Sequence, residues 1–143
     1  MRMQAAEPSL ILDGDTHDGS LIEVQDSDLM ALPQSTFETS TLWTAGVDVF
    51  SGPKLADVLS HYGSGQGDLV LTALNNYNVT MARNMVTDVA PILANRINGE
   101  PFSRREKGPL WVIFPFDQHE EFRTENVYAV SVWQLSRITV IKA

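Results

Sequence analysis

The sequence predicts an α+β domain in which a single mixed β-sheet is accompanied by short helices. Runs of about four to eight residues rich in β-branched and aromatic side chains recur along the chain, separated by turns rich in Gly, Pro, Asn and Asp. Other segments carry apolar residues at the spacing of a helix face. Because 43% of the 143 residues are hydrophobic, residues 1–143 are expected to fold as one domain with a continuous core.

Strands are expected where these short runs lie between turn residues. The expected strands cover residues 9–12, 21–24, 36–43, 68–74, 78–83, 110–114 and 135–141. The fourth and fifth of them form a predicted hairpin around the turn Asn75-Asn76, with Tyr77 at its corner. Residues 46–52 contain two glycines and are expected to form a loop.

Helices are expected in a few places. A single helical turn is predicted over 28–32. In 53–62 the apolar residues follow the i, i+3, i+4, i+7 spacing of a helix face. Asp88 can cap another helix over 89–96. The polar residues 119–126 are interpreted as a loop or a short helix.

The composition excludes several classes of function. The net charge of −8 and the pI near 4.7 argue against a nucleic-acid-binding protein, because no long basic stripe exists to neutralise phosphates. The chain contains no cysteine, which rules out disulfides, thiolate metal sites and a cysteine nucleophile. His17, His61 and His119 lie far apart and lack the spacing typical of metal ligands.

Residues 1–8 are expected to be a disordered or processed N-terminus. They are too short and polar for a signal peptide, but the small residues before Glu7-Pro8 suit the end of one that has been removed. No apolar run reaches the roughly 20 residues that a membrane helix needs. A cysteine-free chain suits the cytosol and the periplasm alike.

A candidate ligand-binding loop precedes the apolar run 110–114. It contains the basic cluster Arg104 to Lys107, followed by Gly-Pro. A charged loop that leads into a buried strand can present polar side chains at the edge of a sheet. Arg105 offers a planar fork of donors, and Glu106 can accept from an amino-substituted heterocycle. A surface ion-pair cluster is the other interpretation of these residues.

Aromatic side chains near polar turns can supply a flat apolar wall with polar tips. They are Trp43, Tyr77, Trp111 and Trp133. Aromatic stacking combined with polar groups at the edges is what a fused heteroaromatic ring requires. The residues alone leave open whether these side chains belong to such a site or to the core.

A series of motifs follows in a fixed order along the chain. They are Phe37-x-Thr39-x-Thr41-x-Trp43-Thr44, Phe50-x-Gly52-x-x-Leu55-x-Asp57-Val58-Leu59, Ala73-Leu74-Asn75-Asn76-Tyr77, Ala94-x-x-x-Asn98-Gly99, Lys107-Gly108-Pro109-Leu110-Trp111-Val112-Ile113-Phe114-Pro115 and Trp133-Gln134-Leu135-x-x-Ile138-x-Val140. In their order and spacing they resemble the sulfite-oxidase-type molybdopterin-binding fold. The resemblance covers roughly residue 21 to the C-terminus.

One departure from this family changes the function that the resemblance implies. Catalytic members hold molybdenum through a cysteine in the strand before the Gly-x-x-Leu-x-Asp-x-Leu helix. Thr39 is the expected counterpart here, and a hydroxyl is a poor substitute for a thiolate on a soft, high-valent metal. Molybdenum is therefore not expected. The sequence then resembles a small cysteine-free subgroup that is similar to periplasmic pterin-binding proteins.

That subgroup implies a function in signalling. Such proteins are similar to ligand sensors that dock on the extracytoplasmic domain of a membrane-bound GGDEF/EAL-type enzyme, which makes or degrades cyclic di-GMP. The leading hypothesis is therefore a non-catalytic, periplasmic protein that binds a reduced pterin or a folate-like compound.

The resemblance and the residue types together give a set of expected ligand-binding residues. They are Thr39, Thr41, Trp43, Asn76, Tyr77, Arg105, Glu106, Lys107, Trp111, Asp117 and Trp133. The tryptophans would stack on the ring and Tyr77 would close one side. Glu106 or Asp117 would accept from the ring amino group, and Arg105 would donate to its carbonyl. The two threonines would occupy the space of the metal.

Two other functions stay open. The first is a molybdenum-cofactor oxidoreductase of the sulfite oxidase type, with Thr39 or Ser40 as an oxygen ligand to the metal. The second is a structural interaction domain that binds neither ligand nor metal.

Overall fold

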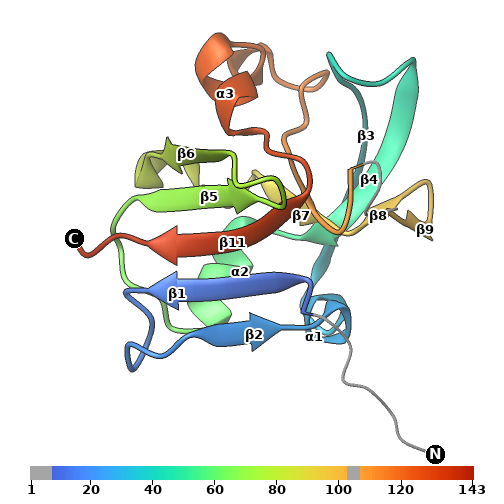
Figure 1. The fold of residues 1–143 in the computed structure, drawn as a ribbon. Helices are drawn as coiled ribbons and strands as arrows, with labels where there is room; N and C mark the ends of the chain where they lie inside the picture. The colour runs from blue at the N-terminus through green and yellow to red at the C-terminus, as the bar shows by residue number, and fades with distance from the viewer. Residues whose placement is uncertain (1–7, 103–106) are drawn as a thin grey trace, which may run out of the picture.

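The computed structural model describes residues 8–102 and 107–143 and confirms the α+β class (Figure 1). The helices are α1 (Asp26–Met30), α2 (Leu55–His61) and α3 (Glu125–Val130), with 3-10 turns at Arg83–Met85 and Glu120–Phe122. The strands are β1 (Leu10–Gly14), β2 (Ile22–Val24), β3 (Gln34–Ser40), β4 (Val47–Pro53), β5 (Leu69–Ala73), β6 (Asn78–Met81), β7 (Ile92–Ala94), β8 (Arg96–Ile97), β9 (Glu100–Pro101), β10 (Trp111–Ile113) and β11 (Leu135–Val140). In this part of the chain, no helix is long and apolar enough to cross a membrane.

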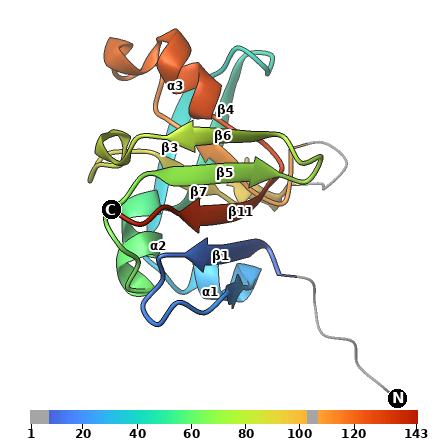
Figure 2. The same cartoon turned by 60° about the vertical axis from the view of Figure 1, so that its left-hand side comes forward.

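The largest sheet has five strands in the order β2-β1-β11-β5-β6. β11 runs parallel to β1 and antiparallel to β5, so the last strand is inserted between two earlier ones. Alternate residues of β5 are buried, namely Leu69, Leu71 and Ala73, as a strand with one face on the core requires. α2 lies over one face of this sheet (Figure 1 and Figure 2), where it buries Leu55 and Val58.

The other strands form two smaller antiparallel sheets. One has the order β3-β4-β8-β9, and the other pairs β10 with β7. A bridge from Lys54, which follows β4, to Ile92 of β7 links the two. A second bridge joins Trp111 of β10 to Trp133, which precedes β11. These bridges connect the β10–β7 pair to the four-stranded sheet and to the segment that leads into β11. Every residue of β7 and β10 is buried.

Several sequence-based expectations are confirmed. The helix expected over 53–62 is α2, and the hairpin expected from 68–74 and 78–83 is formed by β5 and β6. The expected turn at Asn75-Asn76 is present, and the C-terminal strand expected over 135–141 is β11.

The helix predicted over 89–96 is wrong, because residues Ile92–Ala94 form β7 and Arg96–Ile97 form β8. A short apolar run does not distinguish a buried strand from a helix, and pairing with β10 decides in favour of the strand. Pro91, the residue before β7, contacts the start of α2. The carbonyl of Pro91 accepts from the backbone N–H of Leu55 at 2.9 Å, which satisfies the first donor of α2.

The loop predicted over 46–52 is also wrong, because Val47–Pro53 form β4, which lies between β3 and β8. Gly52 suggested a loop, but its missing side chain lets the backbone of Leu93 approach β4. The strands also form three sheets rather than one. Pairing partners far apart in the sequence decide this, and local patterns do not report them.

We expect Gly52→Ala to lower the free energy of unfolding by about 1–3 kcal/mol. The added Cβ would overlap the carbonyl of Leu93, which β7 holds in place through its pairing with β10. Urea unfolding followed by circular dichroism measures the loss. Ser51→Ala, at the preceding position of β4, is the matched control and should leave the midpoint nearly unchanged. An equal loss in both variants would contradict the steric explanation.

Candidate ligand-binding site

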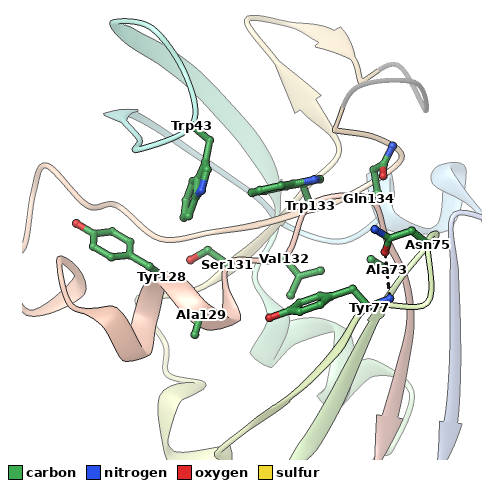
Figure 3. A pocket seen from close by; sticks show the side chains of 10 residues that line it. All are labelled: Trp43, Ala73, Asn75, Tyr77, Tyr128, Ala129, Ser131, Val132, Trp133 and Gln134. Carbon is green, nitrogen blue, oxygen red and sulfur yellow. Dashed lines mark hydrogen bonds between the residues drawn. The ribbon is translucent and has the colours of Figure 1, made fainter.

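A pocket of about 330 Å³ opens at one end of the five-stranded sheet (Figure 3). Three parts of the chain form it: the loop after β3, the end of β5 with the following turn, and the segment from α3 to β11. The lining residues are Trp43, Ala73, Asn75, Tyr77, Tyr128, Ala129, Ser131, Val132, Trp133 and Gln134. Sites for small ligands begin at roughly this volume, ~300 Å³.

Aromatic rings form much of the wall. The ring centroids of Trp43 and Trp133 are 5.6 Å apart with an interplanar angle of 64°, and those of Trp43 and Tyr128 are 5.9 Å apart at 86°. Such edge-to-face packing is favoured because the ring edges are positive and the faces negative. In Figure 3, Trp133 and Tyr77 line the pocket from opposite sides. The pocket therefore offers apolar surfaces on which a planar ring can stack.

Trp111 supports these rings from the core. Its side chain is fully buried, and its Nε1 donates to the carbonyl oxygen of Ser131 at 3.2 Å. Its ring centroid lies 6.0 Å from that of Trp43 and 6.2 Å from that of Trp133. The side chain has no exposed surface for a ligand, so it holds the two pocket tryptophans in place instead.

Lys107 contacts the same wall from outside the pocket lining. Its Nζ lies 4.4 Å from the ring centroid of Trp133, within the range of a cation–π interaction. Its carbonyl oxygen accepts from the backbone N–H of Gln134 at 2.9 Å. Lys107 therefore fixes both the ring and the backbone of this part of the wall.

Thr41 orders the loop that carries Trp43. The Oγ1 of Thr41 accepts from the backbone N–H of Trp43 at 3.1 Å and lies 2.7 Å from the Oγ1 of Thr44. Threonine suits such loops because its hydroxyl replaces a backbone partner. Thr41 thus positions a pocket residue without lining the pocket itself.

Thr39, Ser40 and Asp117 form a separate cluster that ties the end of β3 to the loop after β10. The carboxylate of Asp117 accepts from the hydroxyl of Ser40 at 2.6 Å and from its backbone N–H at 2.7 Å. These two bonds favour the charged form and lower the pKa of Asp117 below its ordinary value. The hydroxyl of Thr39 is buried, donates to the carbonyl of Ser40 at 2.9 Å and accepts from the N–H of Asp117 at 3.1 Å.

Polar groups at the pocket come from the β5–β6 turn and from the end of α3. The Oδ1 of Asn75 accepts from the backbone N–H of Tyr77 at 3.0 Å, drawn as the dashed line in Figure 3. The hydroxyl of Ser131 donates to the carbonyl of Val127 at 2.8 Å. Asn76 adopts φ = 70°, a left-handed conformation that asparagine tolerates, and so it shapes the turn beside the pocket.

The structure divides the expected site residues into groups. The residues brought together in the pocket are Trp43, Tyr77 and Trp133. Those that support the pocket or its turn are Thr41, Asn76, Lys107 and Trp111. Those in the separate cluster are Thr39 and Asp117. Arg105 and Glu106 lie outside the described residues.

Sequence reasoning missed four polar or aromatic lining residues. They are Asn75, Tyr128, Ser131 and Gln134. A signal existed for Tyr128, because α3 begins after Thr124, whose Oγ1 accepts from the N–H of Val127 at 3.3 Å. Thr followed by this spacing is typical of a helix N-cap. Gln134 carried no local signal, because its position depends on the bridge between Trp111 and Trp133.

The described residues that line this pocket carry no charged side chain, although the Nζ of Lys107 lies behind the ring of Trp133. Within ranges 8–102 and 107–143, no group of three or more His, Asp or Glu side chains is placed to hold a metal ion. The described lining is therefore aromatic and polar, without a charged side chain.

Comparison with known proteins shows a relationship in fold. The sequence matches no family model and no curated protein. The structure is similar to the sulfane dehydrogenase SoxCD from Paracoccus pantotrophus, with a TM-score of 0.69 and 15% identity. The match covers 99% of this chain but only 40% of that one. At this identity the likeness shows the fold alone, and it is consistent with the sulfite-oxidase-like fold expected from the sequence.

The described residues do not suit a protein-held molybdenum ion at the expected position. The chain has no cysteine, and the hydroxyl of Thr39 is buried with both a donor bond to Ser40 and an acceptor bond from Asp117. Using that hydroxyl as a ligand would break these two part-buried hydrogen bonds.

We expect Asp117→Asn to lower the free energy of unfolding at neutral pH by less than about 1 kcal/mol, because the carboxylate is solvent-exposed and its charge is screened. The lowered pKa of Asp117 means that its charged form stabilises the folded state above the unfolded pKa, near ~3.9. This contribution is lost as the pH falls through the lowered folded value. The unfolding midpoints of the unaltered protein and of Asp117→Asn, measured from pH 7 to pH 2, should converge in acid. A difference between the midpoints that stays constant with pH would contradict a stabilising role of the charged carboxylate.

Proposed function

We propose that this chain is a non-catalytic pterin-binding protein that senses a reduced pterin. The observation that carries the proposal is the aromatic pocket, in which Trp43, Trp133 and Tyr77 surround a cavity without a charged lining residue in the described chain. A pterin is a flat fused heterocycle with donors and acceptors at its edges. It needs a stacking surface and neutral polar partners, and the pocket supplies both.

The aromatic wall supplies the stacking. An aromatic pair contributes about 0.5–1.5 kcal/mol beyond the area that it buries. Trp133 is well suited as the stacking partner, because Lys107 and Trp111 hold its ring from other sides. A ring that is already fixed loses little conformational entropy when the ligand binds.

For the polar partners, the proposal uses residues of the described pocket lining. Asp117 lies in the separate cluster and does not line the pocket, so the proposal does not use it as the acceptor for the ring amino group. Glu106 lies outside the described residues. In the described lining, hydroxyl groups such as those of Ser131 and Tyr128 serve as acceptors for the ring amino group instead. Neutral partners suit a ligand that is uncharged at neutral pH, because no buried ion pair has to form.

The proposal extends to a partner and a compartment. We place the protein in the periplasm, where it would dock on the extracytoplasmic domain of a membrane-bound GGDEF/EAL-type enzyme and relay the ligand signal to cyclic di-GMP turnover. The resemblance of the sequence motifs to the cysteine-free, pterin-binding subgroup supports this part. The acidic balance of the chain, with a net charge of −8, suits a partner with a basic face.

Titration with a tetrahydropterin or a folate tests the proposal through tryptophan fluorescence and calorimetry. Binding should quench the emission at micromolar ligand, because Trp43 and Trp133 line the pocket. Trp133→Leu should weaken binding by about tenfold or more, since the main stacking surface is lost. Tyr62→Leu, which removes a half-buried aromatic ring outside the pocket lining, is the control and should bind normally. Absence of binding by the unaltered protein would refute the proposal.

The enzyme alternative makes a different prediction. A sulfite-oxidase-type oxidoreductase with Thr39 or Ser40 as the metal ligand requires one molybdenum ion per chain. We expect protein purified from a host that makes molybdopterin to contain far less than stoichiometric molybdenum by mass spectrometry. Stoichiometric molybdenum in the unaltered protein, with a lower content in Thr39→Val, would favour the oxidoreductase. Thr41→Val is the control for nonspecific loss of the metal.

A further inference from the structure

We propose that the side-chain amide of Asn75 donates a hydrogen bond to one edge of the ligand. The pocket would then prefer a ring carbonyl over a ring amino group at that edge. The inference rests on the proposed function. Among pteridines it means that 4-oxo compounds, such as pterins, bind better than 4-amino compounds, such as diaminopteridines.

The orientation of the Asn75 amide is fixed by one hydrogen bond. Its Oδ1 accepts from the backbone N–H of Tyr77 at 3.0 Å. A backbone N–H can be satisfied only by an acceptor, so this bond determines which branch of the amide is the oxygen. The other branch is the amino group, which can only donate. In Figure 3 the amide lies at one end of the cavity and points toward it.

The turn that carries Asn75 is held on several sides. The backbone N–H of Ala73 donates to the carbonyl of Tyr77 at 2.8 Å, and that of Asn76 donates to the carbonyl of Ala73 at 3.0 Å. The N–H of Leu74 donates to the carbonyl of Gln134 at 2.9 Å, which links the turn to another wall of the pocket. The amino group of Asn75 is therefore presented by a rigid backbone, so little entropy is lost when it meets a ligand.

A donor in this position distinguishes ligands by the groups at their edges. A ring carbonyl accepts from the amide nitrogen of Asn75. A ring amino group at the same place would set one donor against another and leave both without a partner. Because Asn75 is solvent-exposed, water relieves part of this penalty, and we expect a preference of about tenfold.

The test compares pterin with 2,4-diaminopteridine by calorimetry on the full chain. The unaltered protein should bind pterin about tenfold more tightly. Asn75→Asp should reverse the preference, because one carboxylate oxygen keeps the bond from the Tyr77 N–H while the other presents an acceptor to the amino group. Asn75→Ala removes the edge contact altogether and should bind the two compounds with similar affinity.

Asn78→Asp is the matched control. It adds the same charge on β6, next to the turn but outside the pocket lining, and should keep the preference of the unaltered protein. Equal binding of both compounds by the unaltered protein, or an unchanged ratio in Asn75→Asp, would overturn the role of Asn75 and leave pterin binding intact. Failure of the unaltered protein to bind either compound and also the tetrahydropterin would overturn the proposed function as well.

Discussion

The buried indole of Trp111 is the interaction on which the pocket depends. It lies in β10, where the smaller sheets meet the segment that leads into β11, and its Nε1 donates to the carbonyl of Ser131. Burial of an indole is favourable only when its N–H finds a partner, and here the partner belongs to the pocket wall itself. The same ring packs edge-on against Trp43 and Trp133, so a core residue sets the positions of two half-buried pocket rings.

The pocket lies apart from the part of the fold where the resemblance places the metal of catalytic relatives. The cluster of Thr39, Ser40 and Asp117 is closed by its own hydrogen bonds and fastens the β3–β4 hairpin to the loop after β10. The pocket lies elsewhere and is lined by rings, amides and hydroxyls. In the proposed function, the cluster serves stability and the pocket serves binding.

The pocket also joins parts of the chain that are far apart in the sequence. Trp43 comes from the loop of the β3–β4 hairpin, Asn75 from the β5–β6 turn, and Tyr128 from α3. A ligand that contacts all three favours conformations in which they are correctly placed, because binding stabilises whichever state it fits. This is a physical route by which a sensor of the proposed kind can pass ligand occupancy to a partner surface.

The sequence by itself determined the α+β class, α2, the β5–β6 hairpin and the C-terminal strand, because hydrophobic periodicity and turn residues are local signals. It also singled out Trp43, Tyr77 and Trp133, together with Trp111, from their place near polar turns, and the first three line the pocket. Only the tertiary structure decided that residues 92–94 form a strand, since their pairing partner in β10 is remote in sequence. It likewise decided that Trp111 is buried whereas Trp43 and Trp133 line the pocket. It also decided that Asn75, and not Asn76, is a lining residue. Burial and side-chain direction depend on how distant segments pack, and a linear pattern does not contain that information.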